Sequence, residues 1–257
     1  MSERARKITF GCFILLNNMI KQFILDLIFP RFCLGCQKEL ELKQTSFICE
    51  TCLNNIALSS VQCHICGLRN KKGACRPCLK KKETFLSGVF AVGKYQDPIL
   101  RETIHQFKYQ GIESLKKPLT ELLIRYLRKE NLIGMLSNSI LTPIPLNWRR
   151  KLNRGFNQSE ILAEELSLVL NCRMINLLKR QKFSAPQAKI KDWQKRKENI
   201  FGAFTLSTSY PQNYQFSESI VVLVDDVTTS GATLEEAAHV LKEAGVKEVY
   251  GLVIATG

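Results

Sequence analysis

The sequence predicts an α/β protein with a mostly parallel sheet, preceded by a small cysteine-rich module. From about residue 85 onward, short apolar runs alternate with segments of helical period. The clearest apolar run, 220–224, is followed by a loop of small residues, a helical segment and a second apolar run. That order is typical of a βαβ unit in a parallel sheet. The length of 257 residues accommodates one such domain and the module.

The composition is that of a globular protein with a basic excess. Hydrophobic residues make up 45% of the chain and charged residues 23%, which excludes a collagen-like, mucin-like or wholly disordered protein. Lys and Arg number 37 against 23 Asp and Glu, so the net charge is +14. This excess favours a polyanionic partner: nucleic acid, a phosphorylated small molecule or an anionic surface.

The first 30 residues predict neither a cleaved leader nor a membrane span. Basic residues precede the apolar run 8–16, but no small-residue cleavage site follows, and polar residues interrupt the run well short of the roughly 20 residues that cross a bilayer. Residues 19–30 predict an amphipathic helix that ends at Pro30. We expect it to pack on its own domain rather than on a membrane. Residues 1–18 are interpreted as an extension before a true start at Met19.

Four consecutive C-x-x-C pairs make up the cysteine-rich module, separated by 12, 10 and 8 residues. Two thiolates from each of two tight turns are what a tetrahedral structural zinc site requires, and such sites favour a reducing, cytoplasmic location. Sequential pairing would give two ions; interleaved pairing stays open. His64 is interpreted as a bystander. The predicted ligands are Cys33, Cys36, Cys49, Cys52, Cys63, Cys66, Cys75 and Cys78.

A basic cluster surrounds the second half of this module and is either a solvated face or a nucleic-acid contact surface. It comprises Lys71, Lys72, Arg76, Lys80, Lys81 and Lys82.

Strands and helices alternate through the main domain. We expect strands at 85–92, 140–144 and near 174–178, and helices at 98–109, 115–129 and 158–170. Asp97 caps the first helix and Pro98 opens it. The second buries Leu119, Leu122, Leu123, Tyr126 and Leu127, and the third Ile161, Leu162, Leu166, Val169 and Leu170.

The βαβ unit carries the strongest functional signal. Its first strand ends in Asp225 and Asp226, its helix buries Leu234, Ala237, Ala238 and Leu241, and its second strand covers 246–255. The loop after a parallel strand presents unpaired N–H groups and a positive helix end to a phosphate dianion. Two adjacent carboxylates suit the vicinal hydroxyls of a sugar, directly or through Mg²⁺. A sugar 5-phosphate is therefore the expected ligand, with local capping and turn formation as the alternative role of these residues.

This unit resembles the binding motif of type I phosphoribosyltransferases, as the segment V-V-L-V-D-D-V-T-T-S-G-A-T (Val221–Thr233) shows. Three further features resemble the ComF family of competence-associated proteins: F-K-Y-Q-G (Phe107–Gly111), the segment P-I-P-L-N-W-R-R-K-L-N-R-G-F-N-Q (Pro143–Gln158) and the cysteine module. So does a discontinuous pattern formed by Pro186, Gln187, Arg196, Asn199, Gly202, Ala203 and Phe204. The resemblance covers 19–257.

The resemblance implies a type I phosphoribosyltransferase fold at 83–257 after a double zinc ribbon at 31–82. The ribose 5-phosphate part of phosphoribosyl pyrophosphate would contact Asp225, Asp226, Thr228, Thr229, Ser230, Gly231, Ala232 and Thr233. Its pyrophosphate, with Mg²⁺, would lie on the loop that contains Arg149, Arg150, Arg154, Gly155, Asn157 and Gln158. Residues 181–200 would form a mobile cover or an exposed basic loop. Lys108 could join this pocket or complement its helix dipole. No catalytic residue is predicted.

Two functions follow from the resemblance. In the first, the protein serves DNA uptake and natural transformation, handles single-stranded DNA beside uptake-machinery proteins, and binds the sugar phosphate without necessarily consuming it. In the second, it is an active phosphoribosyltransferase with an unidentified acceptor. We expect a cytoplasmic protein, with contact to the inner membrane face as an alternative to core packing of residues 19–30.

Overall fold

A computed structural model describes residues 31–41, 46–81, 84–109, 113–181, 198–208, 210 and 216–257. The helix expected at 19–30 and the extension 1–18 lie outside these residues, as does most of the segment 181–200. Within the described ranges, none of the helices has both the length and the apolar character that crossing a bilayer requires.

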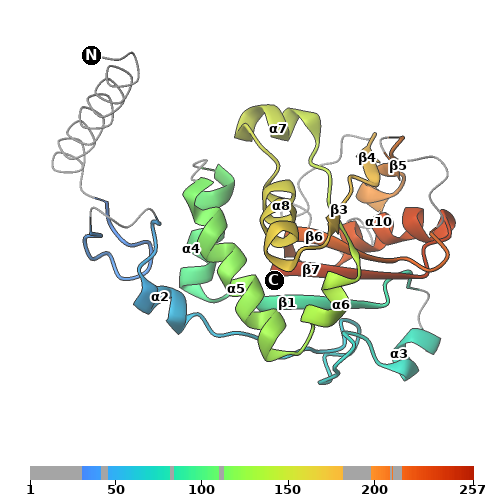
Figure 1. Ribbon diagram of the computed structural model, residues 1–257, viewed down its shortest axis with the longest axis horizontal. Helices are drawn as coiled ribbons and strands as arrows, with labels where there is room; N and C mark the ends of the chain where they lie inside the picture. The colour runs from blue at the N-terminus through green and yellow to red at the C-terminus, as the bar shows by residue number, and fades with distance from the viewer. Residues whose placement is uncertain are drawn as a thin grey trace, which may run out of the picture.

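A five-stranded parallel sheet with the order β1-β7-β6-β2-β3 forms the centre of the molecule (Figure 1). Its strands are β1 (Gly88–Lys94), β2 (Ile140–Pro143), β3 (Arg173–Met174), β6 (Ile220–Thr228) and β7 (Glu248–Thr256). β6 is a central strand, paired with β2 on one side and β7 on the other. Its residues enter the hydrophobic cores on both faces of the sheet, which explains its continuous apolar run. The predicted parallel sheet is confirmed.

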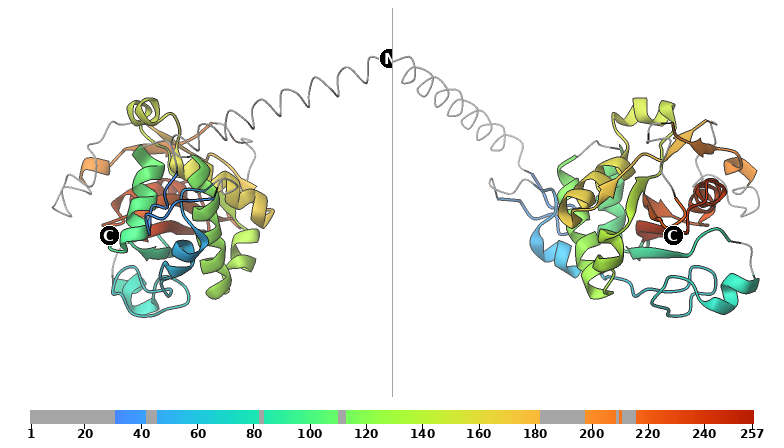
Figure 2. Two further views of the ribbon diagram at one scale, coloured as in Figure 1. Left: turned by 90° about the vertical axis from the view of Figure 1, so that its left-hand side faces the viewer. Right: turned by 45° about the vertical axis from the view of Figure 1, so that its right-hand side comes forward.

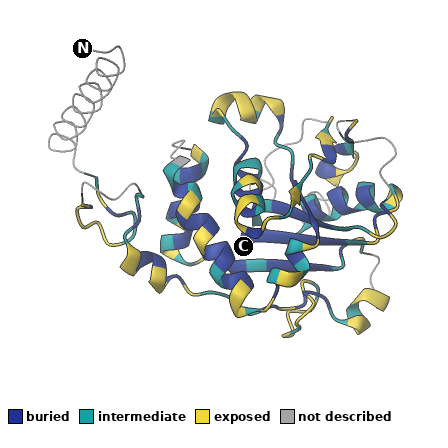
Figure 3. Cartoon of the chain, in the orientation of Figure 1, coloured by how far each residue is buried: buried dark blue, intermediate teal, exposed yellow. Residues whose placement is uncertain are grey.

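Helices cover both faces of the sheet. On one face, α4 (Pro98–Tyr109), α5 (Lys116–Lys129), α6 (Ile133–Ser137) and α8 (Gln158–Leu170) share a hydrophobic core with the strands. On the other face, α10 (Ala232–Glu243) packs its apolar stripe into a second core. In Figure 3 the strands are mostly buried (dark blue), whereas the helices alternate between buried and exposed residues. Within α8 the buried stripe follows Leu162, Leu166 and Leu170, so the prediction that Val169 is buried was wrong: it is 58% exposed.

The structure differs from the expected elements in two places near the sheet's carboxyl edge. The single strand expected near 174–178 is divided: β3 joins the main sheet, whereas β4 (Leu178–Arg180) pairs antiparallel with β5 (Phe204–Leu206). A short helix, α7 (Trp148–Arg154), occupies a segment for which only a loop was expected. None of the side chains of α7 is fully buried, so no apolar period marks it in the sequence.

The cysteine-rich module, which contains α2 (Glu50–Asn55) and α3 (Arg76–Lys81), wraps around the β1 edge of the sheet (Figure 2). Its first half shares the core beside α4 and α5, with Cys33, Cys52 and Leu53 all buried. The chain then crosses to the second half along β1, where the Ser59 N–H donates to the Val92 carbonyl over 2.7 Å. The described residues of both halves of the module therefore contact the sheet domain, although α3 itself buries no residue.

At Gly88 the backbone of β1 packs directly against the backbone of the second half of the module. A Cβ atom at Gly88 would overlap the Lys72 carbonyl oxygen and lie 3.1 Å from the Gly73 Cα. We expect Gly88→Ala to lower the free energy of unfolding by about 1–3 kcal/mol, because backbone must move to accept the methyl group. Urea unfolding measures this, with Gly134→Ala on the exposed face of α6 as the control. Equal stability of Gly88→Ala and wild type would contradict the close packing.

Candidate functional site

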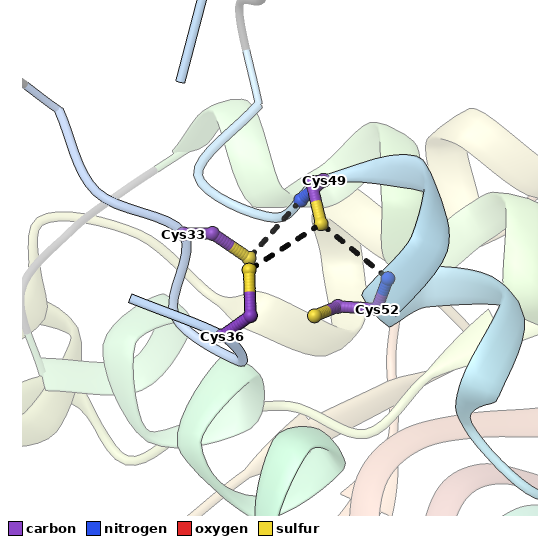
Figure 4. A group of neighbouring side chains, drawn as sticks. All are labelled: Cys33, Cys36, Cys49 and Cys52. Atoms are coloured by element: carbon purple, nitrogen blue, oxygen red, sulfur yellow. Dashed lines mark hydrogen bonds between the residues drawn. The ribbon is translucent and has the colours of Figure 1, made fainter. Parts of the chain in front are cut away.

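Two groups of four cysteine thiols lie in the module, each with its sulfur atoms within 4.8 Å of one another. The first contains Cys33, Cys36, Cys49 and Cys52 (Figure 4), and the second Cys63, Cys66, Cys75 and Cys78. In each group one sulfur pair from different knuckles is 3.8 Å apart. A tetrahedral ion with Zn–S bonds of about 2.3 Å places its sulfurs about 3.8 Å apart. The groups fit two structural zinc ions, and sequential pairing is confirmed.

Backbone N–H groups surround the buried thiols as they do in a thiolate site. The Cys49 N–H donates to the Cys33 sulfur over 3.3 Å, and the Cys75 N–H does the same for Cys63. Burial alone would raise the pKa of Cys33, but backbone donors from Cys49 and Cys36 lower it to about 6. His64 belongs to neither group, since its Nδ1 lies 3.0 Å from the Gly73 carbonyl oxygen.

A cavity of about 540 Å³ opens at the carboxyl ends of β2 and β6. We call it the acid–arginine cavity. It brings together eight of the site residues predicted from the sequence: Arg150, Arg154, Asn157, Gln158, Asp225, Asp226, Thr229 and Thr233. The other predicted loop residues, Thr228, Ser230, Gly231 and Ala232, line a neighbouring cavity, whereas Arg149 and Gly155 line neither.

The two acids have different surroundings. Asp226 is buried, and its Oδ1 lies 2.8 Å from the Lys108 ammonium at the end of α4. Burial would lower the pKa of Lys108, but the Asp226 carboxylate outweighs burial and raises it. Asp225 accepts hydrogen bonds of 2.9 Å from the Ser159 hydroxyl and from the Asp226 N–H. Removal from solvent, together with the Asp226 charge, raises the pKa of Asp225 to about 7.

Three guanidinium groups, from Arg150, Arg154 and Arg180, line the cavity with these acids. Burial and the nearby Arg150 charge lower the pKa of Arg180 to about 10. Arg154 donates to the Gln158 side chain over 3.1 Å, and its guanidinium lies 4.9 Å from the centre of the Tyr109 ring. Positively charged guanidinium groups gathered around a cavity provide a site for a multiply charged anion such as a phosphate ester.

The loop between β6 and α10 has the geometry of a phosphate-binding turn. Gly231 adopts a left-handed conformation (φ 76°) immediately before α10, which a residue with a Cβ would adopt only under strain. The helix therefore starts abruptly, and its first N–H groups are left for an external acceptor. Ser230 accepts a weak hydrogen bond of 3.4 Å from one of them, the Ala232 N–H.

Sequence reasoning missed Arg180 and Ser159, and left the role of Lys108 open. Arg180 comes from the short strand β4, which has no motif of its own. Lys108 lies in the segment F-K-Y-Q-G at the end of α4, and Ser159 directly follows the segment Pro143–Gln158 in the first turn of α8. Only the fold brings these side chains to the acids, so the motifs alone did not show their role.

The comparisons with known proteins agree with this geometry. A family model described as phosphoribosyl transferase domain matches residues 156–256, and one described as double zinc ribbon domain matches 24–79. Competence protein F of Haemophilus influenzae is 31% identical over 229 residues, covering 87% of this chain and 96% of the relative. The chain belongs to the ComF family. Further relatives are DNA utilization protein YhgH of Escherichia coli K12 (30% identity, covering 86% and 94%) and competence protein ComFC of Bacillus subtilis (27%, covering 79% and 81%).

ComF membership accounts for both halves of the chain. The zinc-ribbon match includes both cysteine tetrads, and the phosphoribosyltransferase match includes β6, α10, β7 and the two acids. The predicted fold, a type I phosphoribosyltransferase domain after a small zinc-ribbon domain, is therefore confirmed.

Proposed function

We propose that the acid–arginine cavity binds phosphoribosyl pyrophosphate together with Mg²⁺, within a cytoplasmic protein that handles single-stranded DNA during DNA uptake. The observation that carries the first part is that one cavity is lined by an acid pair, by Thr229 and Thr233 on either side of the turn before α10, and by three arginines, while the turn itself, 230–232, lines the neighbouring cavity. These groups match a ribose, its 5-phosphate and a pyrophosphate respectively.

The placement of the ligand follows from charge. The ribose hydroxyls donate to Asp225 and Asp226, the 5-phosphate accepts from the turn before α10, and the pyrophosphate lies among Arg150, Arg154 and Arg180. Carboxylate and phosphate oxygens are the ligands that Mg²⁺ prefers, so the donor set fits this cation. When bound, Mg²⁺ would neutralise part of the pyrophosphate charge. Lys108 holds the Asp226 carboxylate in place through their 2.8 Å ion pair.

The DNA part of the proposal is supported by the relatives, which are two competence proteins and a DNA utilization protein. It is also supported by α7, at the mouth of the cavity. Trp148 on this helix is 62% exposed, and the Arg149 guanidinium lies 5.2 Å from the centre of its ring. Exposed aromatic rings among basic side chains bind single strands by stacking bases and contacting phosphates.

We therefore expect Trp148→Ala to weaken binding of an oligothymidylate by about tenfold or more. Leu152→Ala is the matched control, because Leu152 is 73% exposed on the same helix but cannot stack on a base. Fluorescence anisotropy at several salt concentrations measures both variants, and affinity should fall steeply with salt. Equal effects of the two substitutions, or an affinity independent of salt, would contradict this surface.

Binding of phosphoribosyl pyrophosphate is expected to strengthen as pH rises through about 7. Below that pH Asp225 is protonated, accepts only a weaker hydrogen bond from a ribose hydroxyl and is a poor ligand for Mg²⁺; above it the carboxylate is ionised. Ser159→Ala removes a hydrogen bond that favours the ionised form, so its binding midpoint should move to higher pH. The ligand's own phosphates titrate equally in both proteins and serve as an internal control. An unchanged midpoint in Ser159→Ala would assign the pH dependence to the ligand.

A further inference from the structure

The two zinc ribbons each contain two C-x-x-C pairs but differ in charge. Between its first and last cysteine, the first ribbon (33–52) contains two lysines and three glutamates. The same part of the second ribbon (63–78) contains four basic residues and no acid, and two further lysines end α3. A tetrahedral zinc site requires only the thiolates, so the ribbon fold does not account for the charge of the second ribbon.

The two ribbons also differ in how they pack. Leu53 and Leu79 each directly follow the last cysteine of their ribbon. Leu53 is 6% exposed and belongs to the core beside α4 and α5, whereas Leu79 on α3 is 38% exposed and lies outside both described cores. Leu68, two residues after Cys66, is 68% exposed. The leucine that anchors the first ribbon therefore has a counterpart in the second ribbon that remains accessible to a partner.

Six basic side chains surround these two leucines. All six are exposed, and none of the ion pairs among the described residues involves them. Each lies within four residues along the chain of a cysteine of the second tetrad, whose sulfurs are within 4.8 Å of one another, so the charges are gathered in one region. Figure 3 shows most of α3 as exposed. We call Leu68, Leu79 and these residues the ribbon face; the basic residues are Arg69, Lys71, Lys72, Arg76, Lys80 and Lys81.

The composition of the ribbon face favours an anionic lipid surface over a nucleic acid. A basic cluster attracts both, but residues 67–81 contain no aromatic ring on which a base could stack. Exposed leucines among lysines are typical of segments that lie on a membrane, because the aliphatic groups enter the interface while the ammonium groups contact anionic headgroups. The aromatic and basic side chains suited to a single strand lie instead on α7.

We propose that the second zinc ribbon docks the protein on an anionic lipid surface through the ribbon face. The contact is peripheral, because attraction to the headgroups and shallow insertion of two leucines supply it. The second ribbon thus has a role beyond stabilising the fold. This role does not depend on the ligand of the acid–arginine cavity.

The test is co-sedimentation of the zinc-loaded, full-length protein with vesicles of phosphatidylcholine and phosphatidylglycerol, with pure phosphatidylcholine vesicles as the reference. Wild type should bind the anionic vesicles, and less tightly as salt rises. Lys80→Gln with Lys81→Gln should weaken binding by about tenfold or more. Lys38→Gln with Lys117→Gln is the matched control, because it removes the same charge from two exposed lysines outside the ribbon face and should leave binding nearly unchanged. The zinc content shows that the ribbons of each variant are intact.

A second pair of variants tests the leucines at high salt, where the charges are screened. Leu79→Ser should weaken the remaining binding by about fivefold, because an aliphatic side chain no longer enters the interface. Leu168→Ser removes a leucine that is 78% exposed on α8, outside the ribbon face, and should leave binding unchanged.

Each outcome supports or overturns the inference. Loss of vesicle binding in the Lys80, Lys81 variant, with binding retained in the Lys38, Lys117 variant, supports it. Equal binding by these two variants, or no binding by wild type, overturns it. Oligothymidylate affinity is measured on the same proteins. If the Lys80, Lys81 variant loses affinity for the oligonucleotide and still binds vesicles like wild type, the ribbon face is a nucleic-acid surface and the inference is wrong.

Discussion

Asp226→Ala is expected to abolish binding of phosphoribosyl pyrophosphate and to lower the free energy of unfolding by about 3–5 kcal/mol. The substitution leaves the Lys108 ammonium, whose side chain is only 17% exposed, without its counter-charge. It also removes one of the two carboxylates proposed to hold the ribose. Calorimetry measures the binding, and urea unfolding measures the stability.

A second substitution separates these two effects. Lys108→Met in the Asp226→Ala background removes the unpaired charge, so stability should recover while binding stays absent. Glu218→Ala is the control, because it breaks an ion pair with Lys247 on the surface, where Glu218 is 85% exposed, and should leave the stability nearly unchanged. Normal binding in the double variant would show that the acid contributes only to folding.

Cys33→Ser is expected to reduce the zinc content from two ions per chain to one and to unfold the first ribbon. In zinc-finger peptides, structural zinc contributes about 10–16 kcal/mol of apparent binding free energy. Cys33 and Cys52 of the first tetrad also belong to the main hydrophobic core beside α4 and α5. The loss should therefore lower the unfolding midpoint of the whole domain.

The matched control is Cys172→Ser, since Cys172 lies outside both tetrads. It should retain both ions and nearly all of the stability. Zinc is counted by atomic absorption after dialysis, and the midpoint is followed by circular dichroism. Two ions retained in Cys33→Ser, or equal losses in the two variants, would contradict the assignment of the tetrads.

The features that could be predicted are those formed by residues that lie close together in the sequence. The strand, acid pair, turn and helix at 220–243 are contiguous, so apolar period, charge and Gly231 predicted them together. The cysteine ligands were equally local. The sequence left open whether the four C-x-x-C pairs combine sequentially or interleaved. In the structure the first two pairs form one tetrad and the last two form the other.

Features that depend on packing could not be predicted. Lys108 and Arg180 are ordinary surface-type residues in the sequence, and only the crossing of α4 and β4 over the sheet edge brings them to Asp225 and Asp226. α7 has no buried stripe to reveal it. The cavity lined by the second zinc ribbon, β1 and α10 likewise depends on packing between segments far apart in the chain.

Isothermal titration of phosphoribosyl pyrophosphate with Mg²⁺ into the zinc-loaded protein tests the central claim most directly. The proposal predicts saturable binding of one ligand per chain, which disappears in the Asp226→Ala, Lys108→Met double variant although that protein remains folded. No heat of binding at millimolar ligand, from wild-type protein that carries both zinc ions, would contradict it.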